Sequence, residues 1–189
     1  MENPKKPAIS ISFPGSAPVL LTQSRFFGKP VYPASWKVAP EAGTIFLAML
    51  NLEEISQLYK HPKLPEKGFL YIYLDISSSI YQPEPTILYS KLPPIYTGDY
   101  PDPSLLNEHP ILKEAKAIEL SLCEPNQEGC KLFGEPCDWN HPDPAPELLL
   151  TLDHMDETFG YAPQIDGFTY FFFGEESDLS DVSIQLEYS

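Results

Sequence analysis

Long apolar runs are absent from the 189-residue sequence. The longest covers residues 45–50, which suits a strand and falls far short of the roughly 18 residues of a membrane-spanning helix. Residues 1–7 contain lysines and prolines, and no signal-peptide core follows them. We therefore expect a cytoplasmic protein that has no membrane partner.

Cysteine and glycine are scarce, with 3 and 10 residues respectively. No glycines are spaced as Gly-x-Gly or precede Lys-Ser/Thr, so loops that bind nucleotide phosphates are not expected. Cys123, Cys130 and Cys137 are spaced seven apart and form no Cys-x-x-Cys pair, although His141 follows them. We expect free thiols in a reducing compartment, no metal site and no cofactor.

The usual signatures of a catalytic nucleophile are also missing. Serines 77–79 are not part of a Gly-x-Ser-x-Gly motif. His61, His109 and His141 directly precede proline, which is typical of turns, and His154 lies in an acidic stretch. We predict no catalytic residues, and the sequence favours a protein that is not an enzyme.

Basic residues are scarce in the second half of the chain. Residues 1–98 contain nine Lys and Arg against seven Asp and Glu, a net charge of +2, whereas residues 99–189 contain three against twenty, a net charge of −17. Nucleic acids and anionic membranes would be repelled by that second half. A basic protein partner is its natural complement, and the alternative is that the acidity only keeps the protein soluble.

Proline is abundant, with 22 residues spread along the chain, and long helices are therefore not expected. Val182, Ile184, Leu186 and Tyr188 alternate with polar residues, which predicts a half-buried strand, and residues 118–122 alternate similarly. The apolar runs elsewhere have the length of buried strands.

One short helix is predicted near residues 51–60. Asn51 can cap its N-terminus, and Leu52, Ile55 and Leu58 form an apolar stripe. Pro62 ends it.

Four landmarks occur twice in the same order. They are Phe-Gly-x-Pro, an apolar run, a Gly-Phe-x-Tyr segment and a final apolar-Tyr-Ser segment. The first set lies at 27–30, 45–50, 68–73 and 87–90, and the second at 133–136, 148–152, 167–172 and 186–189. We predict an α+β fold, predominantly β, with two related halves and mainly antiparallel strands.

At these landmarks the chain resembles the YwqG-like family, a bacterial domain of unknown function. The resemblance implies a compact, β-rich fold with related halves. It includes Phe-Phe-Gly-Lys-Pro, Phe-Leu-Ala-Met-Leu-Asn-Leu and Gly-Phe-Thr-Tyr-Phe-Phe-Phe, and it covers residues 24–33, 46–52, 64–70, 132–136, 148–153 and 167–173. Met49 and Thr151 stand where the family usually has glutamine, and this difference favours a role for the surface over an interior polar site.

The predicted organisation is a single domain in four segments. Residues 1–23 form an N-terminal extension with a first strand, and 24–95 form the first half. Residues 96–110 form a proline-rich connector, and 111–189 form the acidic second half.

Two groups of carboxylates are the predicted binding residues. Asp153, Asp156 and Glu157 follow a predicted strand end, and a second group lies beside the aromatic segment 171–173. The second group consists of Glu175, Glu176, Asp178 and Asp181. The plain interpretation of each group is a charged, solvated loop. As functional residues, the first group could hold a hard cation or act as acid and base, and the second would anchor Lys or Arg of a partner.

Two functions follow from these observations. The first is a non-catalytic protein that docks a basic protein partner, with an immunity or antitoxin protein as the type that fits. The alternative is a small-molecule binder or hydrolase with a carboxylate/His site at the junction of the halves, built from Asp153, His154 and Asp156.

Overall fold

The computed structural model describes residues 7–15, 18–36, 43–77, 83–100, 102–137, 145–154, 167–175, 179 and 181–188. Strands make up 45% of these described residues and helices 10%, and their sheets are antiparallel, so the predicted predominance of β-structure is confirmed. The elements are β1 (Ala8–Ser12), β2 (Arg25–Phe26), β3 (Val31–Pro33), β4 (Thr44–Asn51), α1 (Leu52–Leu58), β5 (Phe69–Asp75), β6 (Glu84–Ser90), β7 (Pro94–Thr97), α2 (Leu105–Glu108), the 3-10 helix η1 (Pro110–Lys113), β8 (Lys116–Ala117), β9 (Glu119–Cys123), β10 (Lys131–Phe133), β11 (Leu148–Asp153), β12 (Gly167–Phe173) and β13 (Val182–Tyr188). Among these residues, no helix combines the length and the apolar character needed to span a membrane.

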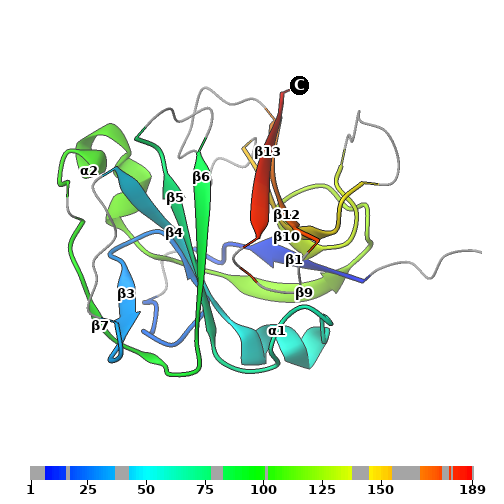
Figure 1. The fold of residues 1–189 in the computed structure, drawn as a ribbon, viewed down its shortest axis with the longest axis horizontal. Coiled ribbons are helices and arrows are strands. Elements are labelled where there is room, and N and C mark those ends of the chain that lie inside the picture. Colours follow the sequence, from blue (N-terminus) through cyan, green and yellow to red (C-terminus); the bar gives the residue numbers. More distant parts are fainter. Residues whose placement is uncertain are drawn as a thin grey trace, which may run out of the picture.

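The strands form two large sheets and one small one. The larger has the order β13-β12-β11-β10-β1-β9, the second has the order β6-β5-β4-β2-β8, and β3 pairs with β7. Figure 1 shows the two large sheets side by side, and their edge strands β6 and β13 lie against each other. One hydrophobic core joins both sheets and includes Ile9, Phe46, Leu70, Leu132 and Phe171.

Each large sheet contains a strand from the other side of the predicted connector. β1 belongs to the predicted N-terminal segment but lies between β9 and β10, where the Ser10 hydroxyl donates to the Ser121 carbonyl at 3.1 Å. β8 follows the connector and pairs with β2. The two sheets are therefore interlocked, because neither is complete without a distant part of the chain.

The short helix predicted near residues 51–60 is α1, and this prediction is confirmed. The Asn51 side chain accepts a hydrogen bond from the backbone N–H of Glu53 at 3.0 Å, which caps the helix. Leu52 and Ile55 are buried, and the helix packs against β9 and β4.

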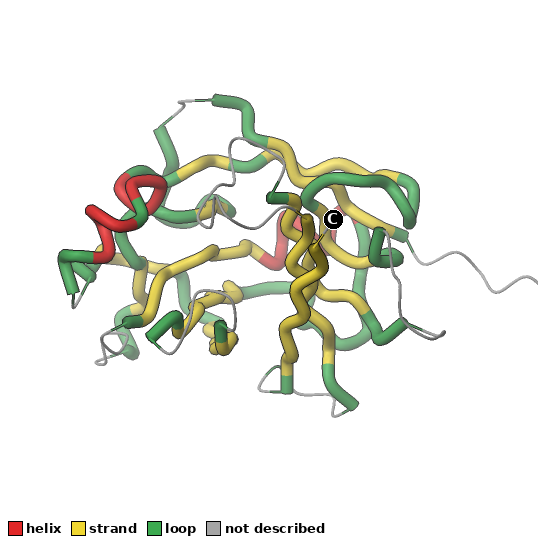
Figure 2. The backbone as a smooth tube through the Cα atoms, turned by 90° about the horizontal axis from the view of Figure 1, so that it is seen from above, coloured by secondary structure: helices red, strands yellow, loops and turns green. Residues whose placement is uncertain are grey.

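The predicted connector, residues 96–110, contains regular secondary structure, which its proline content did not indicate. It includes the end of β7 and the helix α2. In Figure 2, α2 belongs to the red helical segment at the left end of the molecule, away from β13. Leu105 is buried, and the Tyr100 hydroxyl donates to the Gly28 carbonyl at 3.1 Å. These contacts fix the connector on the body of the protein.

The two Phe-Gly turns have nearly the same backbone conformation. Phe27 and Phe133 have φ of 57° and 62°, and the glycines that follow have φ of 74° and 80°. A Cβ on Gly28 would lie 2.7 Å from the backbone nitrogen of Ala115. A Cβ on Gly134 would lie 2.5 Å from the Pro125 carbonyl oxygen. Both turns therefore require glycine for conformation and for space.

Met49 and Thr151 occupy equivalent positions in their sheets. Met49 lies opposite Arg25 on one side and Tyr71 on the other. Thr151 lies in the same way opposite Lys131 and Tyr170. Each position is therefore flanked by a buried cation and a buried tyrosine.

The buried polar groups beside Met49 have fewer hydrogen-bond partners than the buried lysine beside Thr151. Arg25 Nη2 donates to the Leu20 carbonyl at 2.8 Å, but Arg25 Nε and the Tyr71 hydroxyl have no hydrogen-bond partner in the described part of the chain. Burial lowers the pKa of Arg25 and raises that of Tyr71. Lys131, in contrast, donates to the carbonyls of Pro125 and Gln127 at 2.9 and 2.7 Å.

Candidate functional site

The candidate site lies where the segment after α1 meets the six-stranded sheet. α1 ends before Tyr59, and the chain then turns through His61 and Pro62. The His61 imidazole lies between two phenyl rings and is nearly parallel to both. Its centroid is 4.5 Å from that of Phe133, at an interplanar angle of 13°, and 4.8 Å from that of Phe173, at an angle of 10°. This stacking fixes the imidazole between β10 and β12.

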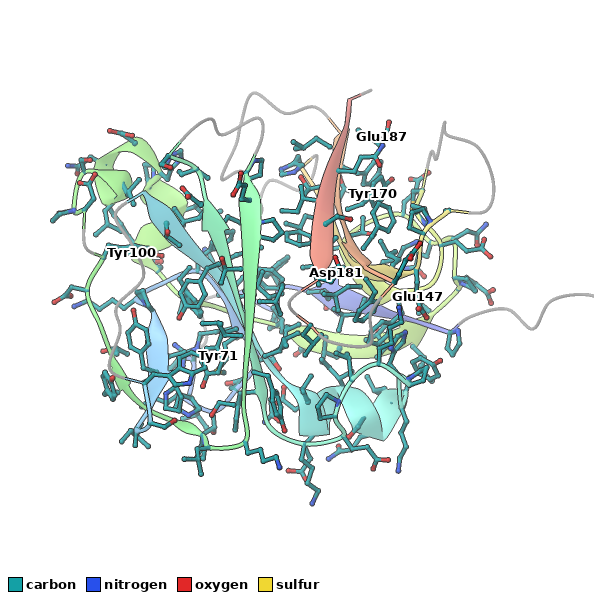
Figure 3. The ribbon with its side chains drawn as sticks, in the orientation of Figure 1. Tyr71, Tyr100, Glu147, Tyr170, Asp181 and Glu187 are labelled. Carbon is teal, nitrogen blue, oxygen red and sulfur yellow. The ribbon has the colours of Figure 1, made fainter. Side chains whose placement is uncertain are left out.

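Glu147 completes the polar part of the site. Its Oε1 lies 3.4 Å from His61 Nε2, and its Oε2 lies 3.2 Å from Lys63 Nζ. Lys63 Nζ also donates to the Gly174 carbonyl at 2.8 Å, and it lies 5.5 Å from the centroid of the Phe173 ring. Figure 3 labels Glu147 to the right of Asp181 and above α1 in this view.

The hydrogen bonds determine which imidazole nitrogen carries the proton. His61 Nδ1 lies 3.3 Å from the backbone nitrogen of Lys63, whose N–H it accepts. The proton of the neutral ring is therefore on Nε2, directed at Glu147. Both nitrogens of the ring are therefore engaged by the chain itself.

A pocket of about 210 Å³ opens beside this group. Tyr59, Phe133 and Glu147 line it, with Pro7 and Gly134 among the remaining residues. Glu147 has 28% of its side chain exposed, so solvent and solutes reach it.

The first predicted carboxylate group is described only in part. Asp153 ends β11 and is half-buried, whereas Asp156 and Glu157 lie outside the described residues. His154 Nε2 lies 2.6 Å from the Thr169 hydroxyl on β12, and burial lowers the pKa of His154 to about 4. The alternative site of Asp153, His154 and Asp156 therefore stays a prediction, with its histidine directed at β12.

The second predicted carboxylate group lies at the connection from β12 to β13. Glu175 and Asp181 are exposed, and the backbone N–H of Gly174 donates to the Asp181 carbonyl at 2.6 Å, which brings the ends of this connection together. Glu176 and Asp178 lie outside the described residues.

We define the acidic surface as the exposed carboxylates described between residues 102 and 188. They are Glu108, Glu114, Glu119, Glu124, Glu128, Glu135, Glu175 and Asp181. With Glu124 set aside, none of them has an ion pair within the described ranges. In the same described stretch Lys113 is the one exposed lysine, because Lys116 is half-buried and Lys131 is 1% exposed.

None of the three cysteines, all of them described residues, forms a disulfide. Cys130 Sγ accepts the backbone N–H of Asp153 at 3.3 Å, and Cys137 Sγ lies 3.3 Å from Lys131 Nζ. The described residues contain no group of three or more His, Cys, Asp or Glu side chains that could hold a metal ion.

No sequence pattern indicates the pocket beside Glu147. His61 precedes proline, which is typical of a turn, and Glu147 is an isolated glutamate in a proline-rich stretch. Comparison of the chain with protein-family models and with curated proteins finds no match.

Proposed function

We propose that the chain is a non-catalytic binding protein that docks a basic protein partner through its acidic surface. The observation that carries the proposal is that seven of the eight carboxylates of this surface have no ionic partner among the described residues. The burial of Lys131 removes one of the three cations of residues 99–189 from the outside. Unpaired carboxylates attract a cationic partner over about a Debye length and favour it over other proteins.

A partner of this chemistry fits an immunity or antitoxin role. Such proteins capture basic toxin enzymes by charge complementarity, which gives fast and selective association. Three cysteines that form no disulfide with one another agree with a cytoplasmic, reducing environment for the complex.

We further propose that the scaffold consists of two related halves of the YwqG-like type. The matched φ angles of Phe27 and Phe133 support this proposal, as do the two glycines after them. A Cβ on Gly28 would also collide with Ala115, and a Cβ on Gly134 would collide with Ala8. Each of these alanines comes from a part of the chain that lies far from the glycine in the sequence.

A matched pair of charge reversals tests the docking proposal. Glu119→Lys changes the acidic surface on edge strand β9, and Glu84→Lys makes the same change on edge strand β6, outside that surface. Proteins captured from the source cells are identified, and the purified partner is titrated at low and high salt. We expect Glu119→Lys and added salt to weaken binding on the order of tenfold, and Glu84→Lys to have a much smaller effect. Binding that neither salt nor Glu119→Lys weakens would contradict the proposal.

A further inference from the structure

We infer that the pocket beside Glu147 receives one arginine side chain of the basic partner. This inference rests on the proposed function and names the contact that anchors it. Hot spots of protein interfaces are commonly single aromatic or arginine side chains in pockets. The pocket of about 210 Å³ is open to solvent and combines a carboxylate with aromatic walls.

The carboxylate of Glu147 has capacity for another donor. Its contacts with His61 and Lys63 measure 3.4 and 3.2 Å, which is longer than the roughly 2.7–2.9 Å of a charge-assisted hydrogen bond. An ionised carboxylate has about four lone-pair sites, and these two contacts leave others available. A guanidinium can donate to it with two parallel N–H groups.

The walls of the pocket suit a flat cation. Tyr59 is the half-buried aromatic residue of the pocket. The Phe133 ring, whose centroid lies 5.7 Å from that of Tyr59 at an interplanar angle of 70°, is buried and already stacks on His61, so Tyr59 is the ring on which a guanidinium would stack. Guanidinium groups are attracted to ring faces by cation–π interaction and stack on them, and a compact ammonium does not stack in this way. The position of Lys63 over the Phe173 ring shows that this cluster already holds a cation against a ring.

The charges around the pocket favour a cation over an anion. Glu135 directly follows Gly134 of the pocket wall, and Glu175 directly follows Gly174, whose carbonyl binds Lys63. Both carboxylates are exposed and have no ion pair within the described segments. Together with Glu147 they outnumber Lys63, whose backbone N–H donates to His61 Nδ1.

Two small probes test the inference directly. N-acetyl-arginine-N-methylamide carries the guanidinium, and N-acetyl-citrulline-N-methylamide has the same shape without the charge. In NMR titrations we expect the arginine probe to shift the Gly134 amide and the Tyr59 ring signals with a Kd of about 1 mM, and the citrulline probe to bind on the order of tenfold more weakly. Equal binding of the two probes would overturn the inference.

Variants locate the binding in the pocket. Glu147→Gln should abolish the difference in affinity between the two probes. Tyr59→Leu, which keeps the carboxylate of Glu147, should weaken the binding of the arginine probe several-fold. Glu84→Gln, far along the chain on β6, should leave it unchanged. An NMR spectrum of each variant establishes that it is folded. Arginine binding that survives both pocket substitutions excludes this site.

The same variants separate the inference from the docking proposal. If the partner binds in a salt-dependent manner and Glu119→Lys weakens it, but Glu147→Gln does not, then the acidic surface docks the partner and the arginine anchor is wrong. If no basic partner binds but the arginine probe requires Glu147, then the pocket recognises cations and the docking proposal is wrong.

Discussion

Met49 lies directly opposite Arg25 in the antiparallel pair β2–β4, and its thioether leaves Arg25 Nε without a strong acceptor. The Tyr71 hydroxyl on the other side of Met49 is also without a partner in the described chain. An unsatisfied buried polar group costs roughly 1–3 kcal/mol.

Met49→Gln should therefore stabilise the protein. The glutamine carbonyl can accept from Arg25 or Tyr71, and the substitution roughly preserves volume, so we expect a gain of about 1 kcal/mol in the free energy of unfolding, measured in urea. The neighbouring Leu50→Gln is the control. Leu50 is fully buried opposite Leu70, where no polar group awaits a partner, and a loss of about 3 kcal/mol is expected there. Equal losses in both variants would contradict this interpretation of the Met49 position.

Gly134→Ala should be much more damaging than Gly129→Ala. Both glycines have positive φ, 80° and 99°, and both alanines carry about 1 kcal/mol of backbone strain. A Cβ on Gly134 would in addition lie 2.8 Å from that of Ala8, whereas nothing lies within 4 Å at Gly129. The midpoint temperature of thermal unfolding should fall further for Gly134→Ala than for Gly129→Ala. Similar falls in the two variants would mean that β1 can move away from Gly134.

Lys131→Met should destabilise the fold by about 3 kcal/mol. The ammonium group is buried and donates to the carbonyls of Pro125 and Gln127, and its removal leaves the buried Pro125 carbonyl without this donor. Lys113→Met removes the same charge from an exposed position and should change the free energy of unfolding by about 0.5 kcal/mol or less. Urea unfolding at neutral pH compares the two, and small changes in both variants would contradict the prediction.

His154 should make the fold sensitive to mild acid. Burial lowers the pKa of His154 to about 4, below its ordinary value of 6.5, so the folded state binds this proton less readily than the unfolded chain does. The stabilisation is therefore complete above pH 6.5 and is lost progressively as the pH falls toward 4.

The substitution His154→Gln tests this dependence. A glutamine side chain cannot titrate and can still reach the Thr169 hydroxyl, so the variant should lose less stability than the natural protein between pH 6.5 and 4.5. NMR titration of the His154 ring in the natural protein should show it neutral at about pH 5.5. An ordinary pKa for this ring would contradict the prediction.

Local signals explain what the sequence predicted correctly. α1 follows from the Asn51 cap and the apolar residues Leu52 and Ile55, all within one short segment. β13 follows from the alternation of Val182, Ile184 and Leu186 along a single strand. Such patterns are set by the geometry of one element and need no knowledge of its neighbours.

Long-range relationships explain what it did not predict. The place of β1 between β9 and β10 depends on pairing of residues more than a hundred positions apart, and no local pattern encodes the choice of partner. The group of His61, Lys63 and Glu147 is assembled in the same way. The composition shows that the second half of the chain is acidic, but only the folded structure shows that Lys131 is buried.

The position of β1 also has a consequence for synthesis. Ser10 is bonded to Ser121, 111 positions later, so the first strand leaves the ribosome long before the strands on either side of it exist. Until those strands are made, Ala8–Ser12 has no sheet to join, and its apolar residues Ala8, Ile9 and Ile11, which are buried in the fold, are a natural point for chaperones to bind or for aggregation to begin.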